Sequence, residues 1–326
     1  MDRPQDSSHT ADPARNRLLA NIGRDHFLHG KSKVQIAQDY GISRFQVANF
    51  VQEALDRGIV RISIHLPDDA ADAALASALG IAQVVTVGAA GATAGLDELA
   101  RSVADAVVRT AAPGDTIGMA WSRTLQVAVH YLPAMPTCAF VQLAGAIATD
   151  QDTEGPRLLA GLQARAVWPL WAPLVVPGAK ALCESPEIRS TLEHADALDV
   201  AVIAIGRWKE GTSTVWERVP PTVQRAAKDA GAVTEISGRL LDAQGQAVIT
   251  PVEDMVVSAS LEQIAGAGHK IALAYGADRA PAVLPAVRAG LVDTLVCDLD
   301  LHEALRDLVP ADLASTVEQG HQGRAS

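Results

Sequence analysis

The sequence has no uninterrupted apolar run of 18 or more residues, although 48% of its 326 residues are hydrophobic. A membrane-spanning helix is therefore not expected. The polar N-terminal stretch 1–13 lacks the apolar region of a secretory signal, and we expect it to be a disordered leader, with a second disordered segment at 319–326. These absences favour a cytoplasmic protein with two or three domains and real hydrophobic cores.

The sequence also lacks the patterns that accompany metal sites and common catalytic sites. Its three cysteines, Cys138, Cys183 and Cys297, lie far apart and are expected to be reduced and mostly buried. There is no G-x-S-x-G motif and no phosphate-binding P-loop, and the glycines of GAAGATAG at 88–95 do not keep dinucleotide-binding spacing. We therefore expect no catalytic residue, no metal and no cofactor.

Charge is distributed unevenly along the chain. Residues 14–66 carry eight basic and four acidic side chains, a net charge of +4, whereas residues 67–326 carry a net charge of −13. A basic N-terminal segment on an acidic body is typical of a protein with one DNA-facing module, because phosphate attracts the first and repels the second.

Residues 33–52, KVQIAQDYGISRFQVANFVQ, predict a helix-turn-helix. Ala37 allows two helices to cross closely, and Gly41, four residues later, allows the positive φ of a short turn. Ser43 is placed to cap the second helix. An apolar inner face is provided by Ile36, Tyr40, Ile42, Val47, Phe50 and Val51. The alternative is an ordinary helical hairpin with a polar surface.

The second helix is expected to enter the major groove of DNA. Its exposed N-terminal side carries Arg44, Phe45, Gln46 and Asn49. Arginine, glutamine and asparagine match the edges of guanine and adenine. Together with the cap Ser43, and with Lys31 and Lys33 placed to reach phosphates, these residues form the predicted DNA-binding site.

The rest of the chain predicts an α/β domain over 67–318, after an all-α DNA-binding domain over 14–66 that ends in a strand at 59–66. Apolar strands alternate with helices, which is typical of a Rossmann-like parallel sheet covered on both faces. The expected strands are 83–88, 115–120, 138–144, 199–205, 270–275 and 293–298. The expected helices are 14–29, 70–80, 95–111, 123–132, 156–166, 186–194, 220–230 and 279–289.

Ligands of such sheets bind beyond the carboxyl ends of the strands, so we searched the loops at those positions. The hydroxyls and backbone N–H groups at the start of helix 123–132 predict an anion site, and carboxylates and amides elsewhere predict hydroxyl binding. For each loop the alternative is a simple helix cap, a turn or a solvated side chain. The candidate effector-binding residues are Trp121, Ser122, Arg123, Thr124, Gln142, Gly145, Glu235, Asp278 and Arg279.

Taken together, these motifs resemble the SorC family of bacterial sugar-responsive transcriptional regulators over nearly all of residues 18–305. The resemblance rests on IAQDYGISRFQV, EALDRGIVRISI, GMAWSRTL, VQLAG, AVIAIGRW, GAVTEISGRLLD and KIALAYGADRAPAVLPAVRAGLVDTLVCD, in the family's order and spacing. It implies an effector domain with a fold like that of sugar-phosphate isomerases and glucosamine-phosphate deaminases. It also implies operator DNA as a partner, a sugar, polyol or sugar-phosphate effector, and a homo-oligomer, either a dimer or a tetramer.

The resemblance also indicates where this chain departs from its family. Glu235 stands where aspartate is general, and Arg279 where lysine is usual. Ser122 replaces a glycine, and Met255 falls where an arginine is common, so that an unphosphorylated effector fits as well as a phosphorylated one. The sequence leaves open repression or activation, and two other classes: a sugar-phosphate enzyme with a DNA-binding appendage, and a purely architectural DNA-binding oligomer.

Overall fold

A computed structural model of the chain divides into two compact units, Met1–Pro67 and Asp68–Ser326, each of which is considered by itself. It describes residues 13–57, 59–60, 70–88, 95–147 and 158–309. The expected leader up to residue 12, most of the strand expected at 59–66 and the expected tail at 319–326 lie outside these ranges.

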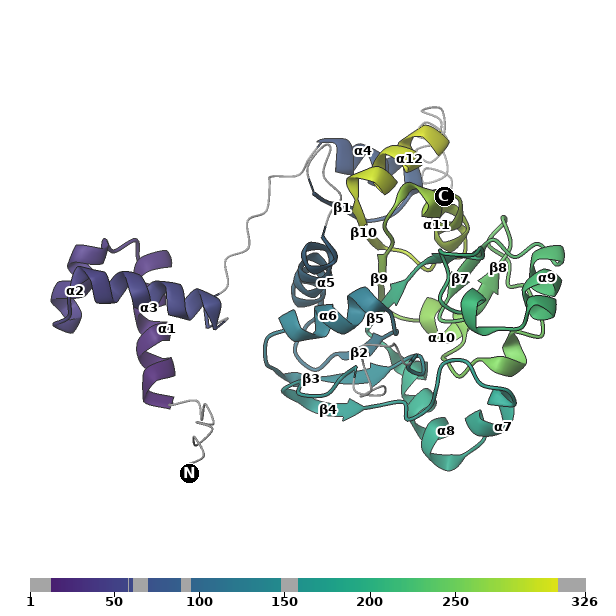
Figure 1. Cartoon of the computed structure of the whole chain (residues 1–326), viewed down its shortest axis with the longest axis horizontal. Coiled ribbons are helices and arrows are strands. Elements are labelled where there is room, and N and C mark those ends of the chain that lie inside the picture. The colour runs from purple at the N-terminus through teal and green to yellow at the C-terminus, as the bar shows by residue number, and fades with distance from the viewer. Residues whose placement is uncertain (1–12, 58, 61–69, 89–94, 148–157, 310–326) are drawn as a thin grey trace, which may run out of the picture. The chain divides into compact units, whose positions relative to one another are not determined.

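Over its described residues, 13–57 and 59–60, the N-terminal unit contains three helices (Figure 1). They are α1 (Pro13–Phe27), α2 (Lys33–Tyr40) and α3 (Arg44–Asp56). A small core joins them, in which Ile22 of α1, Ile36 of α2 and Val47 of α3 are fully buried. Gly41 ends α2 in the left-handed region (φ 63°), and its N–H group lies within hydrogen-bonding distance of the carbonyl groups of Ala37 and Gln38. The predicted helix-turn-helix therefore forms from local turn chemistry and a shared apolar face.

The second unit is built on a seven-stranded sheet with the order β1-β10-β9-β5-β2-β3-β4. All neighbouring strands in it run parallel. The strands are β1 (Gln83–Val87), β2 (Thr116–Met119), β3 (Met135–Gln142), β4 (Ala164–Trp168), β5 (Val200–Ala204), β9 (His269–Leu273) and β10 (Thr294–Asp298). Every residue of β10 is buried, which requires cover on both faces of the sheet. The predicted α/β class is confirmed.

Helices cover the sheet, and the α5–α6 pair packs side by side (Figure 1). Leu99, Val103 and Val107 of α5 are buried in the main core. The α-helices of this unit are α4 (Ala70–Leu79), α5 (Leu96–Thr110), α6 (Arg123–Tyr131), α7 (Ala179–Cys183), α8 (Pro186–Glu193), α9 (Pro221–Asp229), α10 (Leu261–Ala265), α11 (Ala280–Arg288) and α12 (Leu299–Leu308). Short 3-10 turns occur at η1 (His194–Ala197), η2 (Trp216–Arg218), η3 (Glu253–Met255) and η4 (Ala277–Arg279).

A second, three-stranded antiparallel sheet projects from the end of β5 (Figure 1). Its strands are β6 (Gly206–Arg207), β7 (Thr234–Ile236) and β8 (Arg239–Leu241). A separate apolar cluster includes Trp208, Val219 and Leu240 of this region. The sequence analysis did not anticipate this sheet, although it carries part of the candidate site.

One predicted helix, 156–166, is wrong. The described part of that range contains a turn at 158–161 and the first residues of the strand β4. Gly161 breaks the chain direction with a φ of 84°, and Ala166 and Val167 then pair with Ala139 and Phe140 of β3. Pairing along the sheet edge has overridden the helical preference of the alanines and leucines in this segment.

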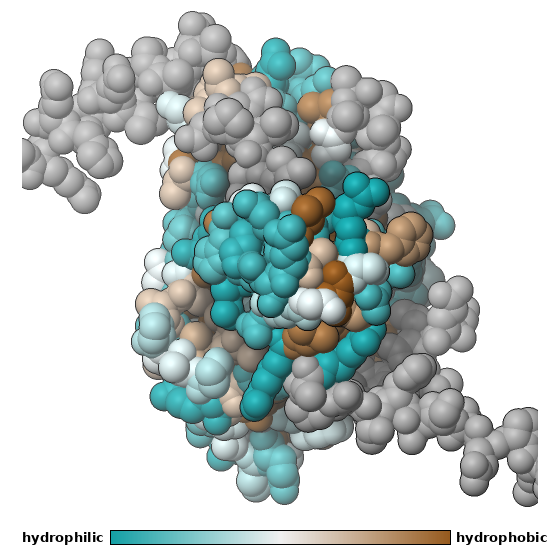
Figure 2. Space-filling view, turned by 90° about the vertical axis from the view of Figure 1, so that its left-hand side faces the viewer, coloured by the Kyte–Doolittle hydropathy of each residue, from teal (hydrophilic) through white to brown (hydrophobic). Residues whose placement is uncertain are grey.

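The face of the molecule in Figure 2 is mainly hydrophilic, with separate apolar side chains rather than one continuous apolar surface. No described helix combines the length and the apolar character that crossing a membrane requires.

Candidate functional site

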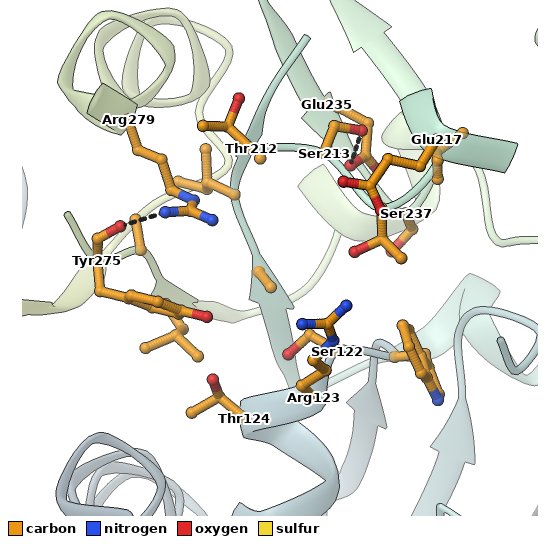
Figure 3. A pocket seen from close by; sticks show the side chains of 18 of the residues that line it. Ser122, Arg123, Thr124, Thr212, Ser213, Glu217, Glu235, Ser237, Tyr275 and Arg279 are labelled. Atoms are coloured by element: carbon orange, nitrogen blue, oxygen red, sulfur yellow. Dashed lines mark hydrogen bonds between the residues drawn. The ribbon is translucent and has the colours of Figure 1, made fainter. Parts of the chain in front are cut away.

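A pocket lies at the carboxyl ends of β2, β5 and β9, where the small sheet meets the large one (Figure 3). Five segments line it: the β2–α6 loop, the β5–β6 junction with the segment after it, β7 with the β7–β8 turn, the β9–η4 loop, and the β4–α7 segment through Leu174. This is the edge at which the sequence analysis placed the effector site, and the pocket contains Trp121, Ser122, Arg123, Thr124, Glu235 and Arg279 from the predicted set.

The β2–α6 loop presents hydroxyl and cationic groups to the pocket. Ser122 caps α6, because its side chain accepts a hydrogen bond from the Leu125 N–H at 3.1 Å. Arg123 and Thr124 follow at the start of the helix and line the pocket (Figure 3). Trp121 is buried, and its indole N–H has no partner among the described residues. The positive end of the helix backbone and the Arg123 guanidinium favour a negative or strongly polar ligand group here.

Arg279 approaches the pocket from the side of β9 (Figure 3). Its guanidinium donates a hydrogen bond of 2.6 Å to the Tyr275 carbonyl and lies 4.7 Å from the centre of the Tyr275 ring. Asp298 stabilises the β9–η4 loop, because its carboxylate accepts a 2.9 Å hydrogen bond from the Gly276 N–H group. The same carboxylate caps α12 by accepting the Leu301 N–H. Arg279 is therefore preorganised by its own strand-end loop.

Glu235 provides a buried carboxylate on the opposite side of the pocket (Figure 3). It is 7% exposed and accepts hydrogen bonds from the Ser213 hydroxyl at 3.1 Å and from the Gly238 N–H. Burial raises the pKa of this carboxyl above its ordinary value, and the hydrogen bonds from Gly238 and Ser213 offset part of that rise. Gly206 leaves room for the carboxylate, since a Cβ there would lie 2.8 Å from its Oε2 atom.

Three of the predicted residues, Gln142, Gly145 and Asp278, do not line this pocket. The Gln142 amide is used inside the fold, where it donates to the Ala144 carbonyl and accepts from the Leu170 N–H. Gly145 packs against protein backbone, because a Cβ there would lie 2.6 Å from Leu174 and Pro173 atoms. Asp278 has an exposed side chain beside Lys209. Met255 also lies outside the pocket lining.

Sequence reasoning missed several pocket residues. Thr212, Ser213 and Glu217 come from a segment that follows β6, and Ser237 comes from the β7–β8 turn. The Ser-Gly dipeptide at 237–238 was an available turn signal between two apolar runs. The approach of Ser213 to Glu235 joins positions 22 residues apart, and no local pattern indicated it.

The predicted DNA-reading residues lie on the surface of the N-terminal unit. Arg44, Gln46 and Asn49 are exposed on α3, and Phe45 is 77% exposed. Ser43 and Gln46 form a capping box, in which the Ser43 side chain accepts the Gln46 N–H and the Gln46 side-chain oxygen accepts the Ser43 N–H at 2.9 Å. The Gln46 oxygen is thereby used at the helix start, which leaves its NH₂ group as the donor for recognition.

The two candidate phosphate contacts differ in their surroundings. Lys31 donates to Asp39 at 2.8 Å and lies 3.4 Å from Asp25, and the hydrogen bond to Asp39 raises its pKa. Lys33, at the start of α2, is exposed. Lys33 is therefore better placed than Lys31 to contact a phosphate. Lys31 instead links α1 to α2 through Asp25 and Asp39.

Within the described ranges, no group of three or more His, Cys, Asp or Glu side chains has the arrangement of a metal site. Cys138 and Cys297 are buried, Cys183 is half-buried, and all three are free thiols.

Comparisons with known proteins give one consistent result. A family model described as "Putative sugar-binding domain" matches residues 67–305. The chain is 26% identical to the "Uncharacterized transcriptional regulator YjhU" of Escherichia coli K12, over 84% of this chain and 89% of that protein. It is 24% identical to the sorbitol operon regulator of Klebsiella pneumoniae, over 89% of this chain and 97% of that protein.

A solved structure shares the fold of both units. The crystal structure of the full-length sorbitol operon regulator SorC from Klebsiella pneumoniae aligns with a TM-score of 0.69 and 21% sequence identity. The alignment covers 91% of this chain and 99% of that one.

Proposed function

Because the chain belongs to the sugar-binding-domain family of SorC-type regulators, we propose that it is a DNA-binding transcriptional regulator controlled by a sugar, polyol or sugar phosphate. The resemblance expected from the sequence is confirmed by the family match over 67–305 and by relatives described as regulators. The observation that carries the proposal is one chain with two sites: a helix-turn-helix with an exposed polar recognition helix, and a polar pocket at the strand ends.

The effector site uses both the cationic and the acidic groups of the pocket. Arg123, the start of α6 and Arg279 bind the more negative or polar end of the effector, such as a phosphate or an electron-rich hydroxyl group. Two lone-pair directions of the Glu235 carboxylate are already used within the protein. The remaining lone pairs accept hydrogen bonds from hydroxyl groups of the effector. Serine and threonine hydroxyls between these groups adapt as donors or acceptors.

The DNA site uses the start of α3. Arg44, Gln46 and Asn49 contact base edges in the major groove, and Phe45 packs against a thymine methyl group. Lys33 contacts a phosphate, and Ser43 holds the helix start in place. We further propose a dimer or tetramer, because two recognition helices one helical turn apart bind a palindromic operator more tightly than one. We propose a cytoplasmic location as well, because a regulator must reach its operator.

The effector acts by binding one arrangement of the oligomer more tightly than another. A bias of about 1.4 kcal/mol changes occupancy tenfold. The enzyme alternative is not supported by the comparisons, since the relatives are regulators.

A thermal-shift screen of the purified full chain tests the effector half of this proposal. The probes are D-sorbitol, D-mannitol, D-glucose and the 6-phosphates of each. A probe at about 100 times its Kd stabilises the folded protein by about 2.7 kcal/mol, which raises Tm by several degrees. A flat response to sugars, polyols and their phosphates alike would contradict the assignment.

A further inference from the structure

Ser237 has an unusual backbone for a serine. It is the one non-glycine residue with a positive φ (51°) within the described ranges. Ile236 pairs with Arg239 across the β7–β8 hairpin, so the loop contains only Ser237 and Gly238. Gly238 also has a positive φ of 82°. Two consecutive positive φ values in a two-residue loop are typical of a type I′ turn.

The turn does not by itself require a serine. Type I′ turns favour asparagine, aspartate or glycine at the first central position, because other side chains collide with the backbone there. The turn itself is fixed by Gly238, where a Cβ would lie 2.3 Å from Val256. A glycine at position 237 would form the same turn with less backbone strain. The turn therefore does not explain why a serine is present.

The Ser237 hydroxyl is buried without a partner. The residue is 6% exposed, and its Oγ atom has no hydrogen bond in the described structure. A buried hydroxyl without a hydrogen-bond partner destabilises the folded state. Ser237 therefore carries two unfavourable features, its backbone conformation and its unpaired hydroxyl. Such costs gather at binding sites, where a ligand provides the missing partner.

The position of Ser237 indicates that partner. Glu235 of β7 and Ser237 of the turn both line the pocket, while Ile236 between them is buried in the main core (Figure 3). Glu217 lies on the same side of the pocket as both (Figure 3). The Ser237 side chain has one rotatable bond, so its hydroxyl can turn toward a ligand without a backbone change.

We propose that Ser237 is a specificity-determining residue, whose hydroxyl pairs with one hydroxyl group of the effector while Glu235 takes another. The assignment of Ser237 rests on the proposed effector site and specifies which groups of the effector that site recognises. The acidic side of the pocket recognises a polyhydroxylated carbon chain, and any phosphate lies toward Arg279, across the pocket from Glu235 (Figure 3). A ligand that lacks one of the two hydroxyls binds more weakly.

The test compares four full-length proteins: wild type, Ser237→Ala, Ser237→Gly and Ser258→Ala. Ser258 is a matched control, because it is also buried with an unpartnered hydroxyl but does not line the pocket. Binding is titrated by calorimetry with D-sorbitol, D-mannitol, D-glucose and their 6-phosphates, and Tm is measured without ligand.

We expect Ser237→Ala and Ser237→Gly to weaken binding of the recognised probe by about 3- to 10-fold, and Ser258→Ala to leave it unchanged. Without ligand, the Tm of Ser237→Gly should exceed that of Ser237→Ala by about 2–4 °C, because glycine relieves the left-handed backbone. Weaker binding by Ser237→Gly together with a Tm no lower than that of the wild type would show that the serine serves the ligand rather than the fold.

Wild-type affinity in Ser237→Ala would overturn the assignment of Ser237 while leaving the proposed function intact. Equal Tm values for the alanine and glycine variants would overturn the strain on which the assignment depends. If the wild type binds no probe, the proposed function fails first, and the role of Ser237 falls with it.

Discussion

The Ser213 hydroxyl donates a 3.1 Å hydrogen bond to the Glu235 carboxylate, and both side chains are buried. Ser213 lies in the segment after β6, whereas Glu235 lies in β7. With the Gly238 N–H on its other oxygen, the carboxylate is fixed before an effector arrives. A carboxylate held in this way discriminates between hydroxyl positions better than a mobile one, because less ordering is needed on binding.

Replacing Glu235 with glutamine should stabilise the ligand-free protein at neutral pH. Burial raises the pKa of Glu235 in the folded state above its ordinary value of 4.5. The folded state therefore holds this proton more tightly than the unfolded chain, and wild-type stability falls as pH rises through the interval above 4.5. The Glu235→Gln variant does not lose stability in this pH interval, because its side chain does not ionise. Its affinity for the effector should fall about tenfold.

Urea unfolding of both proteins between pH 4 and pH 8 measures this effect. The stability advantage of Glu235→Gln should grow as pH increases and disappear below about pH 4.5, where the carboxyl is protonated in both states. An advantage that is the same at every pH would show that the ionisation of Glu235 is not its source.

Arg44→Ala should reduce specific operator binding by about 1–3 kcal/mol, because a contact to a guanine edge is lost. Arg57→Ala is the matched control, since Arg57 pairs with Glu53 and Asn16 at the far end of α3. Fluorescence anisotropy with the operator and with an unrelated duplex distinguishes a loss of sequence-specific binding from a loss of non-specific binding. Equal losses on both duplexes would remove Arg44 from the base-reading set.

Lys33→Ala should weaken binding to all duplexes and lower the salt slope by about one, as expected for one lost phosphate contact. Lys31→Ala should lower the slope less and reduce the stability of the N-terminal unit, because Lys31 pairs with Asp39 and Asp25. The measurements are binding at four salt concentrations and thermal unfolding. The reverse order of slopes would assign the phosphate contact to Lys31.

Asp298→Ala should destabilise the protein by about 2–3 kcal/mol, because the start of α12 and the Gly276 N–H both lose their acceptor. Effector binding should weaken as well, since Gly276 begins the turn that carries Arg279. Asp298→Asn retains an acceptor oxygen and should recover most of both properties. Calorimetric unfolding and effector titration measure the two effects, and intact affinity in the alanine variant would exclude support of Arg279 by Asp298.

The sequence predicted those parts of the fold that depend on local chemistry. Gly41, Ser43 and the apolar spacing around them indicate the helix-turn-helix from local sequence alone. The buried strands β5 and β10 are nearly continuous apolar runs, which is the pattern of a central parallel strand. The edge strand β4 was missed, because its pairing with β3 and not its own residues decides its conformation.

The site was predicted only where it follows the rule for strand ends. Ser122, Arg123 and Arg279 were found because they lie directly after β2 and β9. Gln142 satisfies the same rule at the carboxyl end of β3, yet the N–H group of Leu170, which is 28 positions later, occupies its amide oxygen. Thr212 and Glu217 were missed because the small sheet brings them to the pocket, and that sheet forms through non-local pairing.

The most direct test of the account is operator binding by the full-length chain in the presence and absence of its effector. The duplex is selected by the purified protein from a random library, and the effector is the probe that raises Tm most. We predict that saturating effector changes the Kd for this duplex by tenfold or more, and that Glu235→Gln needs a higher effector concentration for the same change. Selection of no duplex, or an unchanged Kd at saturating effector, would contradict a DNA-binding regulator controlled through this pocket.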